Sequence, residues 1–259
     1  MARLLALVRV VSTVSVLALT LSACSGGQGD RVGTNPASSP SAAPSGSVTP
    51  SSDPQLVTQH GMIVDFDSNQ PIAGATVTAN DATAVTDAKG VYDLKVHKDE
   101  AFEMNVTSDG YVKLVEQETT LSVDYDRGKT TIVPMGLANL LHNTLQGYDA
   151  TLGVLSVAVL PTGGCKSEGG AKIDVTPKGV AKIRYFASKL PSNSETVVAG
   201  EFPSAVIYNL QPGVAITVTV ESPSCTQAAF PIVSNGITYL ATVSTEAGDV
   251  TSFQRLFLQ

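Results

Sequence analysis

The chain has 259 residues, of which 43% are hydrophobic and 5% aromatic, and it contains no Trp. Its formal net charge of −7 at pH 7 argues against nucleic acid or an anionic membrane surface as a binding partner, because both repel an acidic protein. A chain of this length built from many short strands is long enough for two domains of ordinary size.

The first 24 residues are expected to be a targeting segment and not part of the fold. Arg3 and Arg9 form a charged end, and the apolar run at 10–21 is too short to span a membrane comfortably. Leu-Ser-Ala-Cys at 21–24 resembles a bacterial lipobox, which implies that residues 1–23 are a lipoprotein signal peptide and that Cys24 is lipidated. The alternative is an ordinary secretory signal with an incidental cysteine. We therefore expect an exported protein, anchored to a bacterial membrane by its N-terminal lipid, at the outer membrane or the cell surface.

Residues 24–54 are rich in Ser, Pro and Gly and offer almost nothing to bury, which predicts a disordered tether. A flexible coil of about 30 residues spans roughly 30 Å, so the tether would hold the following domains away from the membrane. A glycosylated stalk is the alternative that the Ser and Thr content permits.

Residues 55–134 show the alternation of a half-buried sheet, in which a period of two places every second residue on the buried face. Met62, Val64 and Phe66 alternate with their neighbours. The same strand pattern recurs at 75–79, 91–96, 102–106, 111–115, 121–125 and 130–133. Polar turns containing Pro or Gly separate the first three strands. This pattern predicts an antiparallel β-sandwich.

The turn and strand residues of 61–96 also form a recognisable pattern, G-x-(I/V)-x-D, then P-(I/L)-x-G-A-x-V, then T-D-x-x-G-x-Y-x-L. The residues that fit it are Gly61, Val64, Asp65, Pro71, Ile72, Gly74, Ala75, Val77, Thr86, Asp87, Gly90, Tyr92 and Leu94. This pattern resembles the carboxypeptidase regulatory-like domain, a prealbumin-like seven-stranded sandwich. The resemblance implies an accessory domain and not a reaction.

Residues 135–150 break the β pattern. Leu137, Leu140, Leu141 and Leu145 fall at helical spacing on one face of the segment 135–146, with Pro before it and Gly after it as boundaries. We expect a short helix that links two domains, and His142 within it is read as a solvated helix residue.

Residues 151–259 return to the β pattern, with strands expected at 171–175, 180–186, 204–210, 214–221, 237–245 and 250–258. The turn Asn-Leu-Gln-Pro-Gly at 209–213 is similar to the last hairpin of many prealbumin-like domains. The segment predicts a second, divergent sandwich. The fold expected is therefore all-β, with two prealbumin/Ig-like antiparallel sandwiches in tandem joined by a short helix.

Two cysteines remain if Cys24 is lipidated. Cys165 and Cys225 each follow an expected strand, and in an oxidising compartment they would form a disulfide across one end of the second sandwich. Two free thiols are the alternative. A metal site is not expected, because two cysteines without neighbouring histidines do not make a tetrahedral ligand set.

No pattern of catalytic residues is present. The sequence lacks G-x-S-x-G and Gly-rich phosphate loops, so we expect no enzyme, no cofactor and no resident metal. The hydrolase known on the prealbumin-like fold needs several histidines, whereas this chain has His60, His97 and His142. Turn acids could bind calcium, but none of them matches the twelve-residue calcium loop. These acids are Asp65, Asp67, Asp87, Asp109, Asp124 and Asp126.

Two functions of different class fit these observations. The first is a non-catalytic, lipid-anchored envelope protein whose sandwiches are structural or protein-interaction modules, with an exposed sheet edge available to a partner strand. The alternative is a carbohydrate-binding module, which usually needs exposed aromatic rings. The candidate rings in the second domain are Tyr148, Tyr185, Tyr208 and Tyr239.

Overall fold

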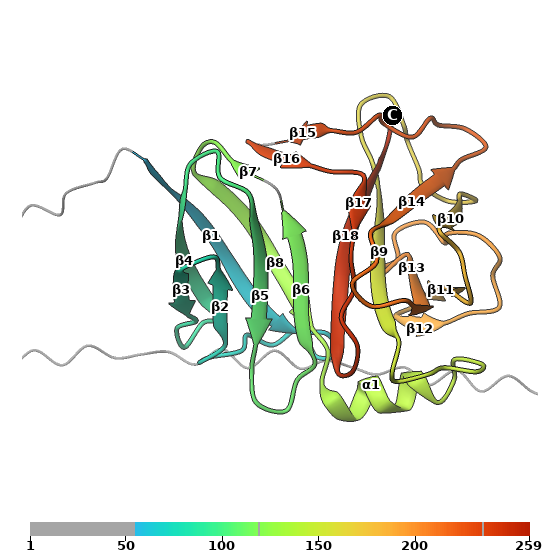
Figure 1. Cartoon of the computed structure of the whole chain (residues 1–259), viewed down its shortest axis with the longest axis horizontal. Coiled ribbons are helices and arrows are strands. Elements are labelled where there is room, and N and C mark those ends of the chain that lie inside the picture. The colour runs from blue at the N-terminus through green and yellow to red at the C-terminus, as the bar shows by residue number, and fades with distance from the viewer. Residues whose placement is uncertain (1–54, 119, 235) are drawn as a thin grey trace, which may run out of the picture. The chain divides into compact units, whose positions relative to one another are not determined.

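The structure, a computed structural model, describes residues 55–118, 120–234 and 236–259. This part of the chain is mostly β with one short helix (Figure 1), which confirms the all-β fold class. No helix in the described ranges is long and apolar enough to cross a membrane. The predictions for the signal peptide, Cys24 and the tether fall outside the described residues. Below, residues 55–134 are called the N-terminal half and residues 151–259 the C-terminal half.

A three-stranded sheet in the N-terminal half has the order β4-β1-β8. Its strands are β1 (Leu56–Asp65), β4 (Val91–His97) and β8 (Tyr125–Ile132). β1 pairs antiparallel with β4 and parallel with β8, which leaves β8 at the edge of this sheet. Alternate residues of β4, among them Tyr92, Leu94 and Val96, are buried, as the period of two predicts.

A nine-stranded sheet runs through both halves of the chain in the order β12-β11-β13-β9-β18-β6-β5-β2-β3. Four of its strands belong to the N-terminal half: β2 (Thr76–Ala79), β3 (Ala82–Val85), β5 (Phe102–Thr107) and β6 (Lys113–Glu118). The others are β9 (Gly153–Pro161), β11 (Lys182–Ala187), β12 (Leu190–Pro191), β13 (Ala205–Leu210) and β18 (Val250–Leu258). The last strand, β18, lies between β9 and β6 and pairs with both (Figure 1). It thereby joins the two halves into one hydrogen-bonded sheet.

A second three-stranded sheet, in the order β10-β14-β17, belongs to the C-terminal half. Its strands are β10 (Lys172–Thr176), β14 (Ile216–Glu221) and β17 (Thr242–Val243). Ile173 and Val218 of this sheet share a core with Leu155 of β9, Ile207 of β13 and Leu256 of β18.

The sheets β4-β1-β8 and β10-β14-β17 cover opposite faces of the nine-stranded sheet. Phe253 of β18 lies opposite Glu116 of β6 and belongs to the N-terminal core, together with Ile63. Leu256 of the same strand belongs to the C-terminal core. Since successive side chains of a strand point to opposite faces, the odd-numbered residues of β18 face one core and the even-numbered residues face the other.

Two smaller elements complete the fold. The strands β7 (Thr120–Leu121), β15 (Ile232–Ser234) and β16 (Ile237–Tyr239) form a sheet in the order β15-β16-β7, so that the two halves also pair here. The helix α1 (Met135–His142) follows β8 and lies below the ends of β9 and β18 in Figure 1. Leu145, just past α1, packs on Val154 and Phe186.

Several details differ from the sequence prediction. β18 pairs parallel with β6 and β9, and β1 pairs parallel with β8, so not every pairing is antiparallel. The strand expected at 121–125 is absent, because β7 ends at Leu121 and Val123 is exposed. The strand expected at 237–245 breaks into β16 and β17, and the helix ends at His142 instead of residue 146. Alternation gives the face of a residue but not its pairing partner, and the pairing decides where each strand stops.

Candidate functional site

A pocket of about 300 Å³ opens on the face of the nine-stranded sheet that also carries β4-β1-β8. Its floor is made by paired residues of the two central strands, in which Thr251, Phe253 and Arg255 of β18 lie opposite Val154, Ser156 and Ala158 of β9. Close-packed interiors have few voids larger than a water molecule. A pocket of this size is therefore a built feature of the fold and a candidate binding site.

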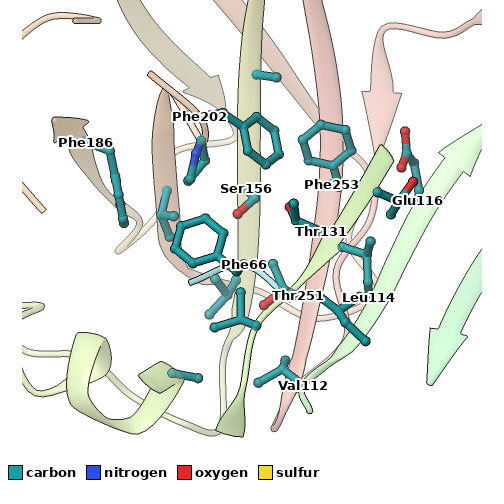
Figure 2. A pocket seen from close by; sticks show the side chains of 18 of the residues that line it. Phe66, Val112, Leu114, Glu116, Thr131, Ser156, Phe186, Phe202, Thr251 and Phe253 are labelled. Atoms are coloured by element: carbon teal, nitrogen blue, oxygen red, sulfur yellow. The ribbon is translucent and has the colours of Figure 1, made fainter. Parts of the chain in front are cut away.

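The walls of the pocket come from both halves of the chain. The end of β8, from Lys129 to Ile132, and the following Val133 form one side, and Phe186 and Phe202 stand on the other. Figure 2 shows the rings of Phe66, Phe202 and Phe253 around the hydroxyl of Ser156. The rings of Phe202 and Phe253 pack edge to face with their centroids 5.6 Å apart. The interior is thus largely apolar with a few hydroxyl groups.

The helix α1 closes the end of the pocket nearest Thr251. Leu141 and Leu145 line this end, and the pair Val154 and Thr251 forms the adjacent part of the floor. The single apolar face predicted from helical spacing is only partly confirmed, because Leu141 and Leu145 meet the sheet whereas Leu140 is 62% exposed. This end of the pocket is the more apolar one.

The opposite end of the pocket holds a buried charge cluster, defined as Glu116 of β6, Arg127 of β8 and Arg255 of β18. The two guanidinium groups contact different oxygens of the Glu116 carboxylate. Arg127 also donates from Nε to Oγ1 of Thr130 at 2.9 Å. Burial, together with repulsion from Arg255, lowers the pKa of Arg127 to about 9, so Arg127 stays charged at neutral pH.

Arg255 is the most exposed member of the cluster, and it lines the pocket together with Glu116. Its side chain is 17% exposed, whereas that of Arg127 is 0% exposed. The guanidinium lies over the rings of Phe253 and Tyr239, at 5.2 and 5.9 Å from their centroids. Aromatic faces and a carboxylate together hold a guanidinium in a fixed orientation. Arg255 is therefore a positioned cation at one end of an apolar pocket.

Two further contacts fix the rim. Lys189, which follows β11, donates from Nζ to the backbone oxygen of Phe66 at 2.8 Å and lies 5.4 Å from the centre of its ring. His142 of α1 stacks on Tyr148 with the ring centroids 4.1 Å apart. Burial lowers the pKa of His142, so the ring at the rim is neutral at pH 7. His142 is thus half-buried at the pocket and not the solvated residue that the sequence suggested.

Among the turn acids singled out in the sequence, Asp65 and Asp87 hold turns. The Asp65 carboxylate accepts hydrogen bonds from the backbone N–H groups of Asp67 and Ser68 and from the hydroxyls of Ser68 and Tyr111. Asp87 accepts from the backbone N–H groups of Lys89 and Val91.

Burial alone would raise the pKa of Asp65, but its hydrogen bonds outweigh burial and hold it below the ordinary value. Hydrogen bonds to the charged form have this effect.

No metal site is found among the described residues. Within residues 55–118, 120–234 and 236–259, no group of three or more His, Cys, Asp or Glu side chains is placed to hold a metal ion. The chain's cysteines at 165 and 225 are joined by a disulfide in the C-terminal half, with their Cα atoms 5.6 Å apart. Both sulfur-bearing residues pack against the C-terminal core.

The tyrosines considered as a sugar platform are mostly buried. Tyr185, Tyr208 and Tyr239 are each at most 7% exposed, and the Tyr185 hydroxyl accepts a hydrogen bond from the Ile173 backbone N–H at 2.8 Å. Tyr148 is stacked under His142. These four side chains do not form an exposed aromatic surface.

Sequence reasoning missed the pocket and its charge cluster. One signal was available, because alternation places Glu116 on the same strand face as Val112 and Leu114, and Arg255 on the same strand face as Phe253 and Phe257. A charged residue at an inward position of a strand is rarely buried unless it is paired. The pattern could have marked both residues as paired, but the partner of each is far away in the sequence.

No family model matches this chain, and no curated protein sequence matches it. The resemblance of residues 61–96 to the carboxypeptidase regulatory-like domain therefore stays a prediction. Among solved structures, a chain of a type II cohesin–X-dockerin complex from Acetivibrio cellulolyticus aligns with 29% of this chain at 19% identity and a TM-score of 0.27. The aligned part spans 56% of that chain, a little over half of its length.

Two other solved structures align over more of the chain. The minor pilin of Streptococcus agalactiae aligns with 78% of this chain and 95% of its own, at 10% identity and a TM-score of 0.25. The Bacillus anthracis TIE protein aligns with 79% of this chain and 34% of its own, at 13% identity and a TM-score of 0.24. These are distant similarities, and they assign the chain to no family.

Proposed function

We propose that the chain is a non-catalytic, lipid-anchored cell-envelope protein whose β-sandwich domains, residues 55–134 and 151–259, serve as an interaction module. Residues 24–54 would be its tether and residues 135–150 the connection between the domains. The module binds an apolar group of its ligand or partner in the pocket over β9 and β18. The pocket is the observation that carries this proposal.

The lining of the pocket supports binding in preference to catalysis. Phe66, Phe202 and Phe253 supply apolar surface, and burial of apolar surface is the main source of affinity at such sites. The ionisable side chains of the lining are Lys113, Glu116, Lys129, His142 and Arg255, and Glu116 contacts Arg255. A nucleophile activated by a neighbouring base is the usual mark of a hydrolase, and no such pair lies in the lining.

The carbohydrate-binding alternative has less support. Sugar platforms need an exposed aromatic ring, and Tyr185, Tyr208 and Tyr239 are buried. The acidic turns and the disulfide are compatible with either function and do not separate them. We therefore keep the interaction module as the proposed function.

Binding of a neutral apolar dye tests the pocket. Nile red, titrated into the purified module of residues 50–259 and followed by its fluorescence, is expected to bind at one saturable site. Ser156→Phe and Thr251→Phe each place a ring in the floor, and each is expected to weaken binding by at least ten-fold. Saturable binding that both variants leave unchanged would refute the pocket as the site, and so would the absence of any saturable binding.

A matched control separates filling of the pocket from adding a ring. Thr219 is an exposed residue of β14 on the outer surface of the second three-stranded sheet. Thr219→Phe adds the same ring to a strand and is expected to leave dye affinity within two-fold of the parent. Far-ultraviolet circular dichroism and thermal unfolding of each variant establish that it is folded before its affinity is compared.

Anchoring is tested separately in bacteria that express the full chain. Cys24→Ser is expected to move the protein from the membrane fraction to the soluble exported fraction and to abolish incorporation of radiolabelled palmitate. Membrane association and labelling that persist in the variant would contradict lipidation at this cysteine.

A further inference from the structure

We propose that the ligand of the pocket is an anionic amphiphile, a free carboxylate that carries an unbranched hydrocarbon chain of medium length. This inference rests on the proposed function of the pocket and names the chemical class of its ligand. In the bound state the carboxylate lies at Arg255 and the hydrocarbon chain runs along β9 and β18 towards α1.

The charged end selects the head group. Arg255 is fixed by Phe253 and Tyr239 and is partly exposed at the pocket wall. A guanidinium carries five N–H donors in a planar fork and can bind a second carboxylate oxygen while it keeps its contact with Glu116.

The balance of charge along the lining favours an anion. Lys113, Lys129 and Arg255 belong to the lining, whereas Glu116 is its one carboxylate among the described residues. Both oxygens of that carboxylate are contacted by arginines. These cations therefore attract an incoming carboxylate and repel an incoming ammonium group.

The other end selects the tail. From Arg255 the floor passes Phe253 and Ser156 and ends at Val154, where Leu145 of the segment after α1 packs. Apolar side chains enclose this course, and Figure 2 shows Val112 and Leu114 on its side away from Phe186. An alkyl chain gains affinity with each methylene that it buries here.

The length of the floor limits the length of the tail. Arg255 and Thr251 are separated by four residues of β18, or about 13 Å at the rise of a strand. α1 and its leucines stand beyond Thr251. A straight chain of about that length fits between the guanidinium and the helix, and a much longer chain would have to leave through the open side.

The experiment compares decanoate with 1-decanol, which has the same tail and no charge. Each is titrated into the module loaded with Nile red at pH 7.5, and displacement of the dye gives its affinity. Decanoate is expected to bind at least ten-fold more tightly than 1-decanol. Arg255→Met is expected to reduce this preference to two-fold or less, while Lys172→Met, which removes an exposed cation of β10 on the other face of the sheet, leaves it unchanged.

A measurement on the unaltered protein covers the case in which Arg255→Met fails to fold. The Nε–H resonance of Arg255, followed by ¹⁵N spectroscopy, is expected to shift on addition of decanoate and to stay in place with 1-decanol. Equal affinities for the two compounds, or an Arg255 Nε–H resonance that does not shift on addition of decanoate, would overturn the inference. If Nile red is displaced equally by both compounds, the carboxylate preference fails while the proposed apolar pocket stands. If the dye does not bind at all, the proposed function itself fails.

Discussion

The two halves of the chain each pack a three-stranded sheet on the nine-stranded sheet, but on opposite faces of it. In the N-terminal half, β4-β1-β8 covers the face to which Phe253 points, and in the C-terminal half β10-β14-β17 covers the face to which Leu256 points. Each half is thus a sheet packed on a sheet. The covering three-stranded sheet lies on one face of the nine-stranded sheet in the N-terminal half and on the opposite face in the C-terminal half, and β18 is the strand where the two arrangements meet. The central strand is therefore covered on both faces, and six of its nine residues are buried.

The change of side explains why a pocket lies where it does. β8 is the edge of the first cover, and the second cover is on the other face of the nine-stranded sheet. The strip of β9 and β18 beyond β8 is left to a few phenylalanines, α1 and the segment that carries Leu145. Because these side chains reach over β9 and β18 from either side, they fill the space less completely than a second sheet would, and a pocket remains.

The halves also differ in how they are held. The N-terminal half is tied to β18 by the buried cluster of Glu116, Arg127 and Arg255. The C-terminal half contains the disulfide between Cys165 and Cys225. Three variants test this difference.

The largest effect is expected at Glu116. Glu116→Gln keeps the shape of the side chain and removes the charge that both arginines contact, and loss of one partner of a buried ion pair costs about 3–5 kcal/mol. Urea unfolding at pH 7 measures the loss. Glu246→Gln is the matched control, because the pair of Lys113 and Glu246 is a third to a half exposed and such pairs contribute at most about 1 kcal/mol. Equal costs in the two variants would contradict the role of the cluster.

An intermediate effect is expected from the disulfide. Replacing both Cys165 and Cys225 by Ala opens a loop that spans 60 residues of sequence, and on the chain-entropy model this destabilises by about 2–4 kcal/mol. Because the C-terminal core contains this bridge, native-state hydrogen exchange is expected to quicken first in β10 and β14. Exchange that quickens first in β1 and β4 would show that the bridge holds the other half.

The smallest effect is expected at Asp65, in the first turn of the N-terminal half. Asp65→Asn removes the charge that accepts several hydrogen bonds, and we expect a loss of about 2 kcal/mol at pH 7. The folded-state pKa of Asp65 is lowered, so its contribution is present above the unfolded-state value near 4 and is lost as the pH falls through the folded-state value. The difference in stability between Asp65→Asn and the parent should therefore shrink below pH 4. A difference that stays constant with pH would contradict this account.

The candidate site shows how far sequence reasoning reaches. The positions of β18 that point into the pocket follow from simple alternation at Thr251, Phe253 and Arg255. The meeting of this strand with β6, some 140 residues earlier in the chain, does not follow from any local pattern, because pairing is a property of two strands and not of one. The parallel pairing of β18 on both sides was therefore missed, and with it the pocket.

The sequence by itself determined the strand class, the turns and the face of most side chains. Turn chemistry is local, as at Asp65 and Gly90, where a carboxylate and a positive φ of 74° act on neighbouring backbone. The tertiary structure alone decided that the last strand returns between the halves, that the two covers take opposite faces, and that Glu116 meets two arginines. Those outcomes depend on which distant surfaces bury the most apolar area together, and that quantity belongs to the whole chain and not to any segment of it.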